Sequence, residues 1–205
     1  MDVNTTHLIA IAAALGWASG LRLYAVLFLT GAAGWLGWVE LPPGLHLLQT
    51  PLMLGASGLM LFIEFFADKI PGLDSAWDLI HTVIRIPAGA ALAASVFGID
   101  QGSAAAAAAL LGGTLAATSH VAKSSTRAAI NASPEPFSNI AMSLVGDGAV
   151  PLMLWLSWAH PLWFFGLLGV ALLLMAGLIW VFARFVRALL RRGAALFGAG
   201  RPSST

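Results

Sequence analysis

The stretch IEFFADKIPGLDSAWDLIHTVIR, residues 63–85, places seven ionisable side chains between two segments that are apolar enough to cross a membrane. On a helix, Glu64 and Asp68 lie one turn apart. Residues 74, 78, 81 and 85 follow at spacings of four, three and four, which places their side chains on one helix face. An ionisable side chain at membrane depth is costly unless it faces the protein interior or water. The stretch therefore predicts a polar site inside a membrane protein.

The composition agrees with this interpretation. Hydrophobic residues make up 59% of the 205 residues and charged residues only 9%, whereas a soluble domain has about 25% charged residues. The formal net charge of +1 gives no indication of a nucleic-acid partner. The chain has no cysteine, which excludes disulfides, thiolate catalysis and cysteine-ligated metals. We expect an integral membrane protein without a cofactor, whose partners are the lipid bilayer and a small ion or metabolite.

The apolar segments predict an all-α fold with about six transmembrane helices, since about 20 apolar residues are needed for each crossing. The predicted spans are 6–37, 50–67, 77–98, 103–129, 137–158 and 162–190. The first span is too long for one simple crossing. Gly16, Ser19 and Gly20 precede Arg22 within it, so we expect a kink, an unwound turn or a re-entrant piece there. Residues 1–192 are predicted to form a single bundle, followed by a short flexible cytoplasmic tail at 193–205.

The positions of Lys and Arg predict the orientation of the chain. The C-terminal segment carries five arginines, and Lys69, Lys123 and Arg127 lie in or near two loops on the same predicted side. The loops at 38–49, 99–102 and 159–161 contain neither Lys nor Arg. With six spans, both termini are predicted to be cytoplasmic.

Other predicted spans carry polar stripes of their own. Span four has His120, Lys123 and Arg127 at spacings of three and four, and span five has Asn139 and Asp147 on one face. Five acids thereby meet five bases, as an interior network of compensating charges requires. The candidate ion- or substrate-binding residues are Arg22, Glu64, Asp68, Asp74, Asp78, His81, Arg85, His120, Lys123, Arg127, Asn139 and Asp147. If a metal binds, the candidate ligands are Glu64, Asp68, Asp74 and Asp78.

Some of these charges have a simpler interpretation. Lys69, Asp74 and Lys123 are also compatible with ordinary interfacial charges that reach toward water. Two structural expectations test the site interpretation. Arg22 should pair with a carboxylate, for which Glu64 and Asp147 are the candidates, and one polar cavity should touch spans two to five.

Two internal similarities suggest a repeat. SGLRLYAV at 19–26 is similar to SSTRAAIN at 124–131, because each places an arginine after small polar residues. Three spans per half would make the halves inverted, an architecture common in transporters, whose site lies between the halves. The hairpins at 60–98 and 114–157 are also alike and would imply a parallel repeat. We favour the inverted 3+3 repeat.

The blocks GLRLY, EFFADKIPGLDSAWD, IRIPAGA, HVAKSSTR and SLVGDGAVP resemble a bacterial integral-membrane family, the domain of unknown function 4126. The resemblance spans nearly the whole chain. It implies a small multi-span fold in the bacterial inner membrane, and it implies that the polar positions of the family are Arg22, Glu64, Asp68, Lys69, Asp74, Asp78, Lys123, Arg127 and Asp147. In that family the last block often has a Glu-Asp pair, where this chain has Gly146-Asp147. The resemblance adds no substrate.

Three functions fit these observations. A small secondary transporter or channel is favoured, in which Asp74 and Asp78 titrate or contact a cation and Arg22 or Arg127 holds the substrate or acts as a counter-ion. A membrane enzyme that acts on a lipid-linked phosphate with a divalent metal is an alternative, because paired acids can hold Mg²⁺. A non-catalytic membrane assembly factor is the third, because small residues on several spans permit close helix contacts, including homo-oligomers.

Overall fold

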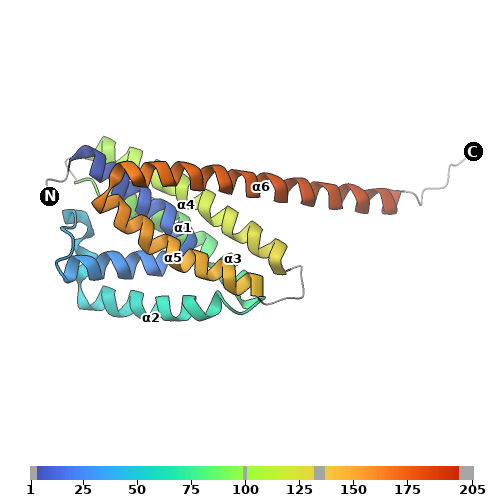
Figure 1. The fold of residues 1–205 in the computed structure, drawn as a ribbon, viewed down its shortest axis with the longest axis horizontal. Coiled ribbons are helices and arrows are strands. Elements are labelled where there is room, and N and C mark those ends of the chain that lie inside the picture. Colours follow the sequence, from blue (N-terminus) through green and yellow to red (C-terminus); the bar gives the residue numbers. More distant parts are fainter. Residues whose placement is uncertain (1–3, 99–100, 132–136, 199–205) are drawn as a thin grey trace, which may run out of the picture.

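A computed structural model describes residues 4–98, 101–131 and 137–198, and in this part of the chain all regular structure is helical. Figure 1 shows the helices as one elongated bundle from which the end of α6 projects. The elements are α1 (Thr5–Trp35), the 3-10 helix η1 (Pro43–Gln49), α2 (Pro51–Ala67), α3 (Leu73–Ser95), α4 (Gly102–Asn131), α5 (Phe137–Ala159) and α6 (Pro161–Gly198). The all-α prediction is confirmed.

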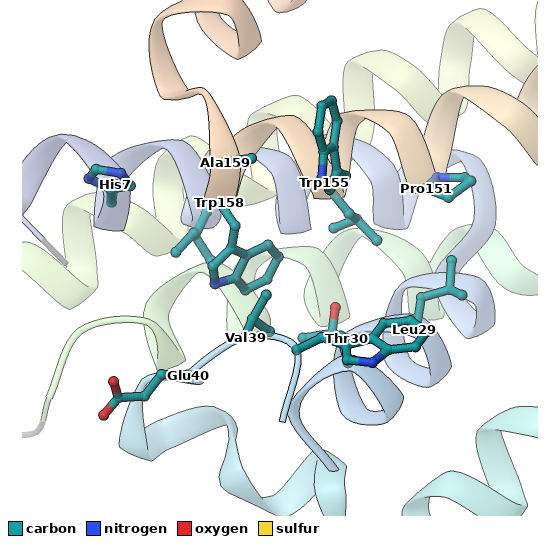
Figure 2. Close-up of a pocket in the computed structure, with 13 residues that line it drawn as sticks. His7, Leu29, Thr30, Val39, Glu40, Pro151, Trp155, Trp158 and Ala159 are labelled. Atoms are coloured by element: carbon teal, nitrogen blue, oxygen red, sulfur yellow. The ribbon is translucent and has the colours of Figure 1, made fainter. Parts of the chain in front are cut away.

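Helix α1 is bent at Arg22, where the backbone is extended, with φ at −149° and ψ at 83°. One pocket touches both His7, near the start of α1, and Ala33, near its end. A straight helix would separate these two residues by about 39 Å. The halves 5–21 and 23–35 therefore fold back toward each other, and Figure 2 shows them as two neighbouring runs of ribbon that carry His7 and Thr30. The predicted break in the first helix is confirmed.

The folded-back α1 forms the centre of the bundle. In its most apolar 18-residue window 78% of the residues are buried, whereas only 11% are buried in the corresponding window of α6. The buried part of α1 is rich in alanine and glycine, and small side chains let neighbouring helices approach closely. At Gly16, an added Cβ would collide with the backbone of Gly112 on α4. The small residues of α1 thus hold α4 directly against it.

The number of membrane crossings differs from the prediction. Four helices, α1, α4, α5 and α6, are long and apolar enough to cross a membrane, and the bent pair η1–α2 can provide a fifth. The chain is therefore a multi-pass membrane protein, but the count of six is not confirmed. The polar side chains at 74–85 reduce the apolar character of α3. The inverted repeat is not confirmed either, because α4 is one helix through Arg127 while α1 is bent at Arg22.

The two ends of the bundle also differ from the prediction. The start of α1 and the end of α6 lie at opposite ends of the long axis (Figure 1). Two cytoplasmic termini were expected because α1 was counted as one full crossing, and this arrangement does not support that expectation. Helix α6 continues to Gly198, beyond the predicted start of the tail at 193. Residues 199–205 of that predicted tail lie outside the described residues.

The contact between Gly16 and Gly112 gives a test of the packing. Replacing Gly16 by Ala should lower the free energy of unfolding by about 1–3 kcal/mol, because the new methyl group meets backbone atoms. The matched control is Gly177→Ala on α6, where no other atom lies within 4 Å of the added Cβ. This control should be neutral or stabilising by up to about 1 kcal/mol. Thermal unfolding in detergent measures both, and equal effects of the two substitutions would contradict the packing.

Candidate functional site

The loop between α2 and α3 brings the predicted acidic pairs together. Gly72 precedes α3 with a φ of +86°, a conformation that glycine adopts without steric cost. Asp74 then caps the start of α3, since its Oδ1 accepts hydrogen bonds from the backbone N–H groups of Gly72 at 2.8 Å and Ser75 at 2.6 Å. This turn places the acids at the end of α2 beside the polar face of α3.

Arg85 joins these two helices. Its Nη2 lies 2.7 Å from Glu64 Oε1, and its Nη1 lies 2.6 Å from Asp78 Oδ1. The side chains of Arg85 and Glu64 are fully buried and that of Asp78 is 3% exposed. A bidentate guanidinium with two carboxylates in a buried site forms strong, charge-assisted hydrogen bonds. Arg85 is therefore a structural link between α2 and α3.

Arg22, at the bend of α1, binds to α5 and to the end of α2. Its Nη1 lies 3.1 Å from Asp68 Oδ2 and its Nη2 lies 2.9 Å from Asp147 Oδ1. Nη2 also donates to the backbone oxygen of Ser143 at 3.0 Å and to its hydroxyl at 2.8 Å. Lys69 Nζ also contacts Asp147, 3.0 Å from its Oδ2. The expected pairing of Arg22 with Asp147 is confirmed, and its other partner is Asp68 and not Glu64.

Lys123 and Arg127 on α4 connect the two groups of ion pairs. Lys123 Nζ lies 3.0 Å from Asp68 Oδ2 and 3.1 Å from Asp78 Oδ1. Arg127 lies 3.2 Å from Asp68 Oδ2, 3.0 Å from Asp74 Oδ2 and 3.5 Å from Asp78 Oδ2. These contacts make one continuous assembly, here called the ion network. Its members are Arg22, Glu64, Asp68, Lys69, Asp74, Asp78, Arg85, Lys123, Arg127 and Asp147.

The ion network is electrically balanced, with five carboxylates and five cations from five helices and the α2–α3 loop. Nearly all its side chains are at most 10% exposed, and only Lys69 and Asp147 reach 19% and 21%. Buried charges are tolerated when each has opposite charges and hydrogen bonds around it, and removal of one partner leaves an uncompensated charge. The network therefore constrains all five helices at once.

Side chains of α4 also bind the backbone of α1 near its bend. Lys123 Nζ donates to the Leu21 carbonyl oxygen at 2.9 Å, and Ser119 Oγ donates to the Trp17 carbonyl oxygen at 2.7 Å. A backbone break at membrane depth is tolerated where protein groups satisfy its polar atoms. The bend in α1 and the ion network are thus parts of one arrangement.

The remaining candidate residues lie outside the ion network. His81 contacts the Tyr24 hydroxyl at 3.1 Å and stacks on Trp77, with ring centroids 4.1 Å apart. His120 Nε2 lies 2.7 Å from Thr82 Oγ1. Asn139 is fully buried, and neither atom of its amide has a hydrogen-bond partner. The structure therefore does not bring these three side chains into the ion pairs.

The geometry gives no support to a metal at the four candidate acids. Glu64, Asp68, Asp74 and Asp78 are each bound by arginine or lysine. Across residues 4–98, 101–131 and 137–198, no group of three or more His, Cys, Asp or Glu side chains is placed to hold a metal ion. The ammonium and guanidinium groups of α1, α3 and α4 instead neutralise these acids.

A pocket of about 490 Å³, here called the lateral pocket, lies beside the ion network. It is bounded by α1, α4, α5 and α6, and its walls are mainly apolar. Arg22, Asp68, Lys123 and Arg127 form its charged wall. The lateral pocket is not the polar cavity expected across spans two to five, because its walls are mostly apolar and none of its described lining residues belongs to α3. The charged side chains of α3, Asp74, Asp78 and Arg85, are instead engaged in ion pairs.

A second pocket, here called the aromatic pocket, has a volume of about 670 Å³ and lies between the two ends of α1, residues 38–40 and the end of α5. Figure 2 shows the Trp158 ring reaching toward Val39 and the Thr30 hydroxyl directed toward the space between them. Trp158 Nε1 and Thr30 Oγ1 have no hydrogen-bond partner. Glu40 lines this pocket, and none of its described lining residues is Lys or Arg, so it differs in charge from the lateral pocket.

Sequence reasoning missed several residues of the site. Asn131 binds both oxygens of Asp74, at 3.0 and 3.1 Å, and Trp17 lines the lateral pocket. Trp17 lies in an apolar helix, where nothing in the sequence separates it from a packing residue. Two other residues of the site had a weak signal in the sequence. Ser143 lies one helical turn from Asp147, and Lys69 directly follows Asp68. Asn131 could have been found because it is a polar residue one helical turn after Arg127.

The chain belongs to the family described as Domain of unknown function (DUF4126), whose model matches residues 9–184. This range contains the whole ion network and both pockets except His7. No curated protein and no solved structure matches the chain. The resemblance seen in the sequence is therefore confirmed.

The burial of Arg85 gives a test of the ion network. Replacing Arg85 by Met should lower the free energy of unfolding by about 3–5 kcal/mol, because Glu64 is left as an uncompensated buried charge. Asp78 keeps its contacts with Lys123 and Arg127. A second substitution, Glu64→Gln, should restore part of the loss because it removes that charge.

Denaturant unfolding in detergent measures these variants, with Arg187→Met on the exposed face of α6 as the control. The control should change the free energy of unfolding by less than about 0.5 kcal/mol. If Arg85→Met behaved like Arg187→Met, or if the double variant were no more stable than Arg85→Met, the ion network would not have the energetic role inferred here.

Proposed function

We propose that this member of the family is a small secondary transporter or channel that moves a small ion or metabolite in a proton- or cation-linked manner. The observation that carries the proposal is the bend of α1 at Arg22, whose guanidinium bridges Asp68 and Asp147. Discontinuous helices that meet charged groups near the middle of the bundle are a recurrent design of transport sites.

The ion network supplies a way to link movement to a proton or cation. Asp147 is the most exposed carboxylate of the network, and it holds both Arg22 and Lys69. A cation bound at Asp147 would compete with Arg22 and Lys69 for its carboxylate, which favours another arrangement of α1 against α5. Two such arrangements with different exposure of Arg22 are what alternating access requires. Asp74 and Asp78, the acids first expected to titrate, are buried under Arg127 and are proposed as its fixed counter-ions.

The distribution of charge supports a proposal for the location of the protein. The network and the arginines of α6 lie toward one end of the bundle, and the aromatic pocket with its tryptophans lies toward the other. By the positive-inside rule, we propose that the network end faces the cytoplasm across an inner membrane. The bilayer is the proposed partner, and exposed apolar side chains on α6 leave room for a homo-oligomer.

The other two functions have less support. An enzyme that acts on a lipid-linked phosphate with a divalent metal would need unpaired acids, and the four candidate acids are bound by cations. An assembly factor would use the network only for stability, so its function would tolerate a neutral substitution at the exposed acid. Transport would not tolerate it, and this difference separates the two.

A flux assay tests the proposal. Purified protein in liposomes with an imposed pH gradient is assayed with a panel of inorganic cations, inorganic anions and small carboxylates. We expect at least one solute to move with protons, and we expect Asp147→Asn to reduce this flux about tenfold or more, because it removes a charge-assisted interaction. The control is Glu40→Gln in the aromatic pocket, which should retain the flux.

Two results would contradict the proposal. The first is a wild-type flux no greater than that of empty liposomes for every solute in the panel. The second is an unchanged flux in Asp147→Asn, which would show that movement does not depend on this carboxylate. A folded, stable Asp147→Asn variant without flux would support it.

A further inference from the structure

Among the described residues that line the lateral pocket, the buried side-chain atoms without a hydrogen-bond partner are all donors. Trp17 is 3% exposed, and its indole N–H has no hydrogen-bond partner. Nη1 of Arg22 and Nη1 of Arg127 lie within ion-pair range of Asp68 and Asp74 but lack hydrogen-bond geometry. All three residues line the pocket. These donor atoms are almost inaccessible in this structure. Since a buried polar group without a partner is costly, they are suited to a ligand whose acceptor oxygens reach them when the side chains of the wall shift.

The charges in the wall of the pocket agree with this. Three cations line it, Arg22, Lys123 and Arg127, and Asp68 is the one carboxylate among the described lining residues. Asp68 itself is in contact with all three cations. Two acceptor atoms of the network, Glu64 Oε2 and Asp78 Oδ2, have no hydrogen-bond partner. They belong to residues that do not line the pocket. An anionic group therefore meets donors and cations here, with one neutralised carboxylate beside it.

The rest of the pocket is apolar and faces outward. Its walls on α5 and α6 include Val145, Leu152, Val170 and Leu174, which are all between 47% and 65% exposed. In a multi-pass membrane protein, such a surface faces lipid. A ligand can therefore enter from the bilayer, with an apolar tail along α5 and α6 and a polar head at the ion network. The volume of about 490 Å³ is that of a small-molecule site.

We propose that the lateral pocket binds an amphipathic oxyanion, which is a carboxylate or phosphate head on an acyl chain. The head lies at Trp17, Arg22 and Arg127, and the chain lies along α5 and α6. This inference rests on the proposed transport function and names its substrate class. It goes beyond the small soluble ion expected from the sequence, because the apolar wall would contribute nothing to the binding of such an ion.

Photo-cross-linking of the full chain in nanodiscs of zwitterionic lipid tests the inference. The probes are diazirine analogues of palmitate and of lysophosphatidate, which separate a carboxylate head from a phosphate head. We expect labelled peptides from 142–153 of α5 and 167–178 of α6, with half-maximal labelling at lower concentration for at least one of the two probes than for diazirine hexadecanol. Labelling by hexadecanol, or by a hexadecyltrimethylammonium analogue, as strong as that of both oxyanions would overturn it.

A matched pair of substitutions locates the head. Trp17→Phe removes an unpartnered indole N–H from the lateral pocket without removing an ion pair, and Trp158→Phe removes one from the aromatic pocket. Trp17→Phe should raise the half-maximal concentration about tenfold, since it removes one hydrogen bond to a charged group. Trp158→Phe should leave it unchanged. Equal effects of the two substitutions would overturn the inference.

A third variant does not depend on the stability of Trp17→Phe. Ala171→Phe on α6 fills the apolar wall and leaves every charged residue in place. It should abolish labelling at 142–153, and persistent labelling there would overturn the proposed position of the chain. The transport proposal and this inference can also be contradicted separately. Specific labelling without any flux would retain this inference and contradict the transport proposal, whereas flux of a soluble ion without specific labelling would do the reverse.

Discussion

The compensation of ten buried charges is the constraint on which the rest of the structure depends. Five acids and five bases share a compact region, and most of them are almost inaccessible. Every helix from α1 to α5 contributes to this region or ends beside it. Removal of one charge leaves its partner buried and uncompensated. The positions of these helices are therefore coupled more tightly than apolar packing alone would require. Helix α6 contributes no member and is correspondingly the least buried of the candidate spans.

The bend of α1 is the second consequence of the same constraint. Because α1 folds back at Arg22, this residue lies at the tip of the bend. There, Asp68 and Asp147 form ion pairs with the guanidinium, and Lys123 Nζ donates a hydrogen bond to the Leu21 carbonyl oxygen. The glycines and alanines of α1 allow its two halves to sit inside the bundle. One helix thereby forms both the core of the fold and one wall of the lateral pocket.

Much of this arrangement could be predicted from particular residues. The spacing of Asp74, Asp78 and Arg85 predicted a common helix face, and Arg22 after small residues predicted a break, because ionisable groups in apolar helices must find partners inside. Helix boundaries followed from proline and glycine and agree to within a few residues, except at the start of α3 and the end of α6.

Other features could not be predicted, for physical reasons. A break does not reveal its angle, so the folded-back course of α1 and the resulting number of crossings were missed. The pairing of Asp68 with three cations depends on tertiary contacts between α1 and α4. The saturation of the acids by arginine and lysine, which leaves an apolar pocket in place of a polar cavity, also depends on distances that the sequence does not contain.

The central claim is that the region around Arg22 becomes accessible from both sides of the membrane in turn. The chain contains no cysteine, and a Cβ at position 146 would lie 3.4 Å from Arg22 Nε, an ordinary contact. The Gly146→Cys variant in liposomes can therefore be treated with a membrane-impermeant thiol reagent on either side. We predict labelling from each side, with rates that change about tenfold in opposite directions when the proton gradient is reversed. Labelling from one side only, at a rate independent of the gradient, would contradict the claim.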